Sequence, residues 1–132
     1  MKLRYLAALA ATGAVLLFAS SAMARGSFPT TITQDGSVAL GAGGTFVVSG
    51  HVTSPQFRCR SLRLVTLIGH YPSGRTQLLD LDLTSARGAW AAKADLTGTD
   101  RLKARVRKSS FRRHGSRKAC QADTIVFPTP SP

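Results

Sequence analysis

The 132-residue chain contains neither glutamate nor asparagine, and it is poor in acids of any kind. All six acidic residues are aspartates, against 18 lysines and arginines, which gives a formal net charge of +12. Glutamate is a good helix former, so its absence argues against a mainly helical protein. Aspartate is favoured in turns, as expected of a β-protein rich in loops. A charge this positive directs attention to anionic partners.

Long apolar runs are also scarce, and the one that occurs lies at the N-terminus. Lys2 and Arg4 form a basic segment before it, residues 5–19 are nearly all apolar, and small residues follow at Ala22 and Ala24. This order is typical of a secretory signal peptide, with cleavage expected after Ala24. A membrane anchor is the rival interpretation, but the run is shorter than the roughly 20 residues that cross a bilayer core. We therefore expect export, with no membrane span after signal cleavage.

Other export and anchoring signals are missing. No cysteine stands at the expected cleavage site, Arg4 has no neighbouring arginine, and the chain ends FPTPSP without a hydrophobic tail. These features disfavour lipoprotein, twin-arginine and C-terminal anchoring routes. We expect a secreted or extracytoplasmic protein, in the periplasm or cell envelope.

Cleavage would remove two basic residues and no acid, so the net charge would fall from +12 to +10. By length, the remainder is a single domain. We expect residues 25–36 to form an N-terminal linker or short first strand, residues 37–128 the folded domain, and residues 129–132 a Pro-rich tail.

Cysteine is limited to Cys59 and Cys120. In an oxidising compartment the two are expected to pair. The bridge would close a loop of about 60 residues, and chain entropy gives it at most about 4 kcal/mol. A metal site built from these cysteines and His51, His70 or His114 has no supporting spacing, because C-x-x-C and H-x3-H are absent. We expect a structural disulfide and no metal or cofactor; free or intermolecular thiols are the remaining alternatives.

Strand signals recur at intervals of roughly ten residues along the mature chain, separated by turns rich in Gly, Pro and Ser. Seven strands are expected, at residues 37–40, 45–54, 61–71, 76–84, 89–96, 101–109 and 123–127. Most have one apolar face, and two such sheets bury those faces against each other. The predicted fold is therefore an all-β, single-domain sandwich.

Alternation assigns the faces of three strands. Within 76–84, the leucines at 79, 81 and 83 are expected inward, with Asp80 and Asp82 outward. Within 89–96, Trp90 is expected in the core, where its indole N–H would need an acceptor. Within 101–109, residues 102, 104 and 106 are expected inward and the basic residues 101, 103, 105 and 107 outward.

Four segments, FVVSGHVTS, LRLVTLIG, LTSARGAW and LKARVRKS, carry a family resemblance. They resemble the immunoglobulin-like or prealbumin-like sandwiches of bacterial secreted proteins, including carboxypeptidase-regulatory-like and collagen-binding B-type modules and actinobacterial secreted proteins. The matching positions are Gly50 and Val52, then Val65 and Leu67, then Thr84, Gly88 and Trp90, with Ser85 where the pattern usually has Asp.

The resemblance covers residues 45 to about 107 and implies a seven-stranded immunoglobulin-like β-sandwich and export, but no activity. Some collagen-binding B-type modules carry a Lys–Asn isopeptide link, which cannot form here because the chain has no asparagine.

Basic residues crowd the stretch 101–118, which contains no acid. Residues 109–119 are expected to form a flexible loop with an exposed Phe111. The candidate anion-binding residues are Arg105, Arg107, Lys108, Arg112, Arg113, Arg117 and Lys118. In one interpretation, this basic stretch is simply a solvated surface that keeps the protein soluble and discourages aggregation at a sheet edge. It can also bind an extracellular polyanion such as teichoic acid, lipopolysaccharide phosphates, acidic polysaccharide or DNA, or a protein partner. Sequence-specific nucleic-acid recognition is disfavoured, because no recognition helix is visible and aromatics are few.

No catalytic residues are assigned, because no convergent cluster of nucleophile and base is visible. Ser73 and His70 occupy a turn-like segment, and the glycines at 41–44 precede no helix. We expect no enzyme, but a secreted structural or interaction module that binds anionic polymers of the cell envelope. The alternative is an accessory protein–protein interaction domain that uses an exposed sheet edge.

Overall fold

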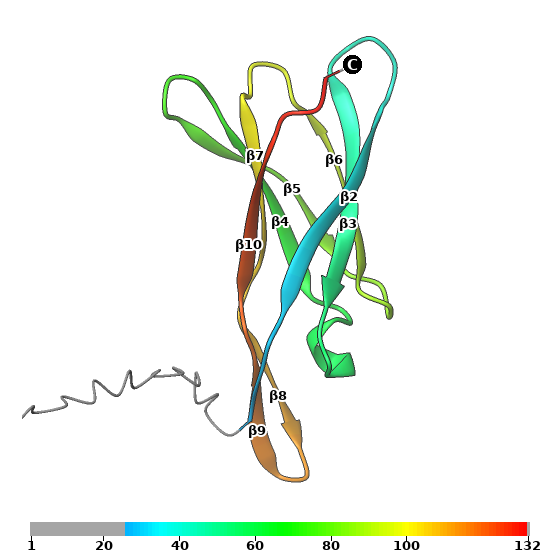
Figure 1. Cartoon of the computed structure of the whole chain (residues 1–132), viewed down its shortest axis with the longest axis vertical. Coiled ribbons are helices and arrows are strands. Elements are labelled where there is room, and N and C mark those ends of the chain that lie inside the picture. Colours follow the sequence, from blue (N-terminus) through cyan, green and yellow to red (C-terminus); the bar gives the residue numbers. More distant parts are fainter. Residues whose placement is uncertain (1–25, 132) are drawn as a thin grey trace, which may run out of the picture.

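The computed structural model describes residues 26–131, which form ten strands and one short 3-10 helix (Figure 1). The elements are β1 Ser27–Phe28, β2 Thr31–Ala39, β3 Thr45–Thr53, η1 Phe57–Cys59, β4 Leu64–His70, β5 Thr76–Leu83, β6 Ala89–Asp95, β7 Arg101–Val106, β8 Ser109–Arg113, β9 Ser116–Cys120 and β10 Asp123–Pro128. The signal peptide expected over residues 1–24 lies outside the described residues. Within residues 26–131, no helix has the length and apolarity needed to cross a membrane.

The strands form three sheets, with the orders β2-β3-β6, β10-β7-β4-β5 and β1-β9-β8. The first two hold the seven expected strands and share one apolar core. The third sheet was not expected, so a total of seven strands is wrong: residues 26–131 form ten strands, in three sheets. In Figure 1 the β8–β9 hairpin projects from one end of the two large sheets, opposite the C-terminus.

Strand β2 begins at Thr31, earlier than the expected strand at residue 37. The segment 25–36, expected as a linker or a short first strand, therefore supplies β1 and the first half of β2 within the described residues. A bulge between Gln34 and Gly36 shifts the register of β2 against β3.

The core is built from alternating residues of both large sheets, as the sequence predicts. Its main members are Ile32, Phe46, Val48, Val52, Trp90 and Ala92 from one sheet, and Val65, Leu67, Leu102, Ala104 and Val106 from the other. Trp90 is 2% exposed, and its ring packs over Gly50, where an added Cβ would lie 2.8 Å from the ring and 1.8 Å from the Thr33 carbonyl oxygen. The expected acceptor for its indole N–H is not found among the described residues.

The predicted faces of β5 are wrong for most of the strand. The pairing of β4 with β5 shifts between Leu67 and Ile68, so that Leu79 is an extra residue in β5. A bulge of this kind reverses which side chains face the core. Leu79 packs against the core, whereas Leu81 and Leu83 are 50% and 58% exposed.

Asp80 and Asp82 consequently point toward the other large sheet and bind its edge strand. Asp80 Oδ2 accepts a hydrogen bond of 2.8 Å from the backbone N–H of Lys93, and Asp82 Oδ2 accepts one of 2.8 Å from Ala91. On the opposite side, Asp123 Oδ2 accepts a bond of 2.9 Å from the backbone N–H of Ile32 in β2. These three residues, the edge-capping aspartates, satisfy backbone donors that an edge strand otherwise leaves open.

Candidate anion-binding sheet

The small third sheet, β1-β9-β8, is called the basic sheet below. Its hairpin turns at His114 and Gly115, whose φ angles are 51° and 74°. A two-residue turn with positive φ at both positions suits the twist of a β-hairpin, and glycine adopts such a φ readily. The expectation of a flexible loop over residues 109–119 is therefore wrong. The signal was present in the sequence, as a His-Gly pair between two short polar segments.

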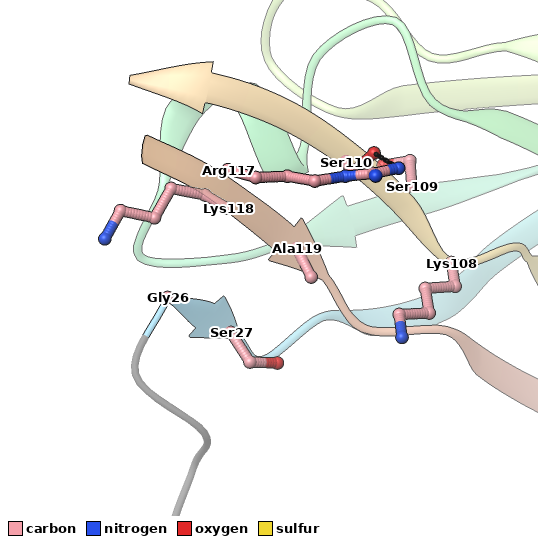
Figure 2. Close-up of a pocket in the computed structure, with 8 residues that line it drawn as sticks. All are labelled: Gly26, Ser27, Lys108, Ser109, Ser110, Arg117, Lys118 and Ala119. Carbon is pink, nitrogen blue, oxygen red and sulfur yellow. Dashed lines mark hydrogen bonds between the residues drawn. The ribbon is translucent and has the colours of Figure 1, made fainter. Parts of the chain in front are cut away.

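One face of the basic sheet gathers arginine and serine side chains. Arg112 lies directly opposite Arg117 in the β8–β9 pair, and Ser110 opposite Ala119. The guanidinium of Arg117 donates to Ser110 Oγ at 3.3 Å, which holds it along the sheet (Figure 2). Residues directly opposite in an antiparallel pair share a face, so the two arginines concentrate positive charge on it.

A shallow depression of about 570 Å³ lies over this region. It is lined by Gly26, Ser27, Lys108, Ser109, Ser110, Arg117, Lys118 and Ala119. Figure 2 shows Lys108 and Lys118 at opposite ends of this group, with Arg117 reaching between them toward Ser110. The lining offers cationic groups and serine hydroxyls, which are the groups that bind phosphate or carboxylate oxygens.

The other face of the basic sheet is anchored by aromatic contacts. The Phe28 and Phe111 rings are stacked with centroids 6.1 Å apart, and the Arg58 guanidinium lies 5.5 Å from the centroid of Phe111. Arg58 also donates to the carbonyl oxygen of Arg112 at 3.5 Å. Phe111 is therefore half-buried and structural, and the expectation that it is exposed is wrong.

Arg58 joins the basic sheet, although sequence reasoning missed it. It precedes Cys59, and the disulfide Cys59–Cys120, with a Cα–Cα distance of 5.2 Å, confirms the expected pairing. That expected bridge could have revealed Arg58, because it brings the residues beside Cys59 to the basic stretch that ends at Cys120. A second depression, of about 400 Å³, is lined by Phe28, Arg113, His114, Ser116 and Lys118.

The seven candidate residues are only partly brought together. Lys108, Arg112, Arg113, Arg117 and Lys118 lie on or beside the basic sheet. Arg105 lies on β7, on the outer face of the four-stranded sheet, and Arg107 lies in the link from β7 to β8. The predicted alternation of β7 is confirmed, since Leu102, Ala104 and Val106 are buried.

Aspartates do not neutralise these cations. Across residues 26–131 the one ion pair joins His51 to Asp35, so none of the seven candidates has a carboxylate oxygen within 4.0 Å. The edge-capping aspartates bind backbone N–H groups instead, and Asp95 binds the backbone and hydroxyl of Thr97. These bonds to Thr97, the hydroxyl first and then the backbone N–H, lower the pKa of Asp95.

Arg63 ties the basic sheet to the large sheets, and sequence reasoning missed it too. It is 3% exposed, and its guanidinium donates to four oxygens. These are Cys59 O at 2.6 Å, Thr30 Oγ1 at 3.2 Å, Arg107 O at 2.5 Å and Gln121 O at 3.1 Å. Burial lowers the pKa of Arg63, but a guanidinium keeps its proton in proteins. The acceptors come from four segments, which this one side chain holds together.

The catalytic and metal alternatives find no geometric support in the part of the chain that the structure describes. Ser73 Oγ accepts from the backbone N–H of Arg75 at 3.4 Å, and His70 Nε2 is buried without a hydrogen-bond partner. Residues 26–131 contain no cluster of three His, Cys or Asp side chains placed to share a metal ion.

Chemically, the basic sheet offers a solvent-open, cationic and hydroxyl-bearing surface. Such a surface suits reversible binding of several anionic groups at once. No protein-family model, curated protein or solved structure matches the chain.

Proposed function

We propose that the protein is an exported, non-enzymatic binding module that holds anionic polymers of the cell envelope on its basic sheet. The observation that carries this proposal is the shared depression lined by Lys108, Arg117 and Lys118, none of which has a carboxylate partner among the described residues. The proposed fold of the two large sheets described above is immunoglobulin-like or prealbumin-like.

Two features support the proposed extracytoplasmic compartment. The N-terminal sequence has the order of a signal peptide, and the disulfide Cys59–Cys120 is of the kind that persists in oxidising compartments. Outside the cytoplasm, the abundant polyanions are phosphate- or carboxylate-bearing polymers rather than messenger or ribosomal RNA. We therefore propose an envelope polymer as the ligand class.

The chemistry of the depression favours repeated, exposed anions over one small buried ligand. Arg117 lines the depression, the exposed Arg112 lies directly opposite it in the β8–β9 pair, and the serine hydroxyls of the lining can donate to the same anion. A shallow, open surface makes few contacts with each group, so affinity would arise from several charges along a chain. Each added contact between a cation and an anionic group makes the binding affinity more dependent on the salt concentration.

The second candidate is a protein contact by strand addition, for which the structure offers β8 as an edge strand. The edge-capping aspartates occupy backbone donors of β2 and β6, whereas β8 ends the order of the basic sheet. An extended peptide could add to the outer side of β8. Because main-chain hydrogen bonds would carry that contact, it should respond little to salt.

Heparin chromatography of the signal-free protein tests the proposal. We compare the wild type with Arg112→Ser/Arg117→Ser, and with a matched control, Arg87→Ser/Lys93→Ser, which removes two exposed charges, one in the turn between β5 and β6 and one on β6. The wild type and control should elute well above physiological salt, and the basic-sheet variant clearly earlier. Elution of the wild type near physiological salt or below, or equal shifts of both variants, would contradict the proposal.

A further inference from the structure

A second surface is apolar, and the proposed polymer site does not account for it. On the outer face of the four-stranded sheet, Leu64, Leu78, Leu81 and Leu83 are 37%, 53%, 50% and 58% exposed. They lie on the neighbouring strands β4 and β5, with Leu64 directly opposite Leu83. We call these four residues the leucine face. A contiguous group of large aliphatic side chains on a surface can mark a contact site.

The leucine face results from the bulge at Leu79. In a regular strand without a bulge, Leu81 and Leu83 would alternate in step with Leu79 and enter the core. With it, Asp80 and Asp82 turn inward and bind the backbone of β6. The same local feature therefore closes the sheet edge and turns leucines toward solvent.

Cations lie beside the leucines on the same face. The register places Leu81, Thr66 and Arg105 in one cross-strand row. A second row runs from Leu78 through Ile68 to Lys103, and His70 pairs with Arg101 in a third. Adjacent strands are about 4.8 Å apart, so the basic residues lie roughly 10 Å from the leucines.

No acid interrupts this face among the described residues of β4, β5, β7 and β10. Asp80 and Asp82 point inward, and Asp123 binds the backbone of β2. The face thus presents leucines and a row of cations in one surface. A complementary partner must offer apolar groups and negative charge side by side.

We propose that the leucine face is a contact surface for an anionic phospholipid bilayer. A bilayer interface presents lipid phosphates directly above acyl chains, which matches cations beside leucines. A second copy is less complementary, because both molecules carry a net charge near +10 after signal removal and repel each other. The inference concerns a surface other than the basic sheet and does not depend on that sheet's ligand.

Vesicle co-sedimentation tests the lipid contact. The probes are vesicles of phosphatidylcholine with phosphatidylglycerol, and vesicles of pure phosphatidylcholine. Leu81→Ser/Leu83→Ser should lower the partition coefficient on anionic vesicles by about tenfold or more, since two leucines lose their burial. Arg101→Gln/Lys103→Gln should lower it by roughly tenfold.

The matched control is Val38→Ser/Leu40→Ser, which changes two other aliphatic residues, 64% and 42% exposed. It should bind anionic vesicles like the wild type. Heparin elution of every variant monitors the basic sheet separately, and near-ultraviolet circular dichroism checks the fold. Suppose that the leucine variant elutes from heparin as the wild type does but no longer binds vesicles. That result supports the lipid contact, whether the wild type binds heparin strongly or weakly.

Other outcomes overturn the proposal. One is a wild type that does not sediment with anionic vesicles, and another is a leucine variant that binds them as the wild type does. Equal binding to neutral vesicles would contradict the role of the cations. A wild type that is dimeric in sedimentation velocity, with a monomeric leucine variant and no vesicle binding, would identify a self-interface instead. Vesicle binding that disappears only in Arg112→Ser/Arg117→Ser would assign lipid to the basic sheet.

Discussion

The two large sheets and the basic sheet are stabilised in different ways. The large sheets share thirteen buried core residues and contain, in or beside their strands, all six aspartates. The basic sheet has no acid, and Cys120 is its one fully buried side chain among the described residues. A disulfide, the guanidinium of Arg63 and one aromatic stack hold it in place. The hydrophobic core stabilises the two large sheets, whereas a few individual links attach the basic sheet to them.

This difference explains the charge distribution. In the large sheets, three aspartates bind backbone N–H groups at sheet edges rather than lysines or arginines. These three of the six aspartates therefore stabilise the sheets and do not neutralise basic side chains. The cations of the basic sheet keep their charge uncompensated, which is the property that a polyanion site needs.

The largest expected effect comes from cutting the covalent link. Cys59→Ala/Cys120→Ala should lower the free energy of unfolding by about 4 kcal/mol or somewhat less, because it opens a loop of 61 residues. Urea denaturation measures this loss. Amide exchange should accelerate more in β8 and β9 than in β3 or β4. A loss below about 1 kcal/mol would show that the disulfide adds little to the other links.

Removing the buried guanidinium should have the next largest effect. Arg63→Met leaves the carbonyl oxygens of Cys59, Arg107 and Gln121 without their donor, and should cost about 3 kcal/mol. Arg63→Lys keeps the charge but cannot reach all four acceptors, so it should lie between Arg63→Met and the wild type. If Arg63→Met unfolded at the same urea concentration as the wild type, the four hydrogen bonds would have no net role.

Removing two of the edge-capping aspartates tests how the large sheets are stabilised. Asp80→Ala/Asp82→Ala removes two carboxylate acceptors and should cost about 2 kcal/mol. It also frees the edge of β6, so light scattering should reveal faster aggregation. The control Asp35→Ala removes an exposed aspartate that contacts His51 and should change neither quantity appreciably.

The smallest effect concerns acid stability. The pKa of Asp95 is lowered from its ordinary value of 3.8 by the hydrogen bonds from Thr97. Its stabilising contribution is therefore fully present above the ordinary value, and is lost as the pH falls through the lowered value. Asp95→Asn should thus be slightly less stable than the wild type at neutral pH, with the difference vanishing in strong acid. A difference that is constant across an acid titration would contradict this assignment.

The sequence was sufficient to predict the seven strands of the large sheets, their main core residues and the disulfide. Regular alternation in β6 and β7 made those faces readable, and the pairing of the two cysteines followed from the expected export. The total of seven strands was wrong because the hairpin at His114 and Gly115 lies in a stretch dominated by charge, which obscured its turn signal.

Other features depended on tertiary structure. The faces of β5 reverse at one extra residue, and nothing in the local alternation of leucine and aspartate marks Leu79 as the bulge. Arg63 looked like one more basic residue in a strand, because its four acceptors come from four separate segments. Five of the seven candidate cations converge on the basic sheet, whereas Arg105 lies on the outer face of β7.

The central claim is that the basic sheet, and not the overall positive charge, binds polyanions. The most direct measurement is the salt dependence of binding to labelled inorganic polyphosphate, followed by fluorescence anisotropy. Arg112→Ser/Arg117→Ser should give a shallower slope of log Kd against log salt, because fewer counterions are displaced. Arg87→Ser/Lys93→Ser should leave the wild-type slope unchanged, and equal slopes for both double variants would contradict the claim.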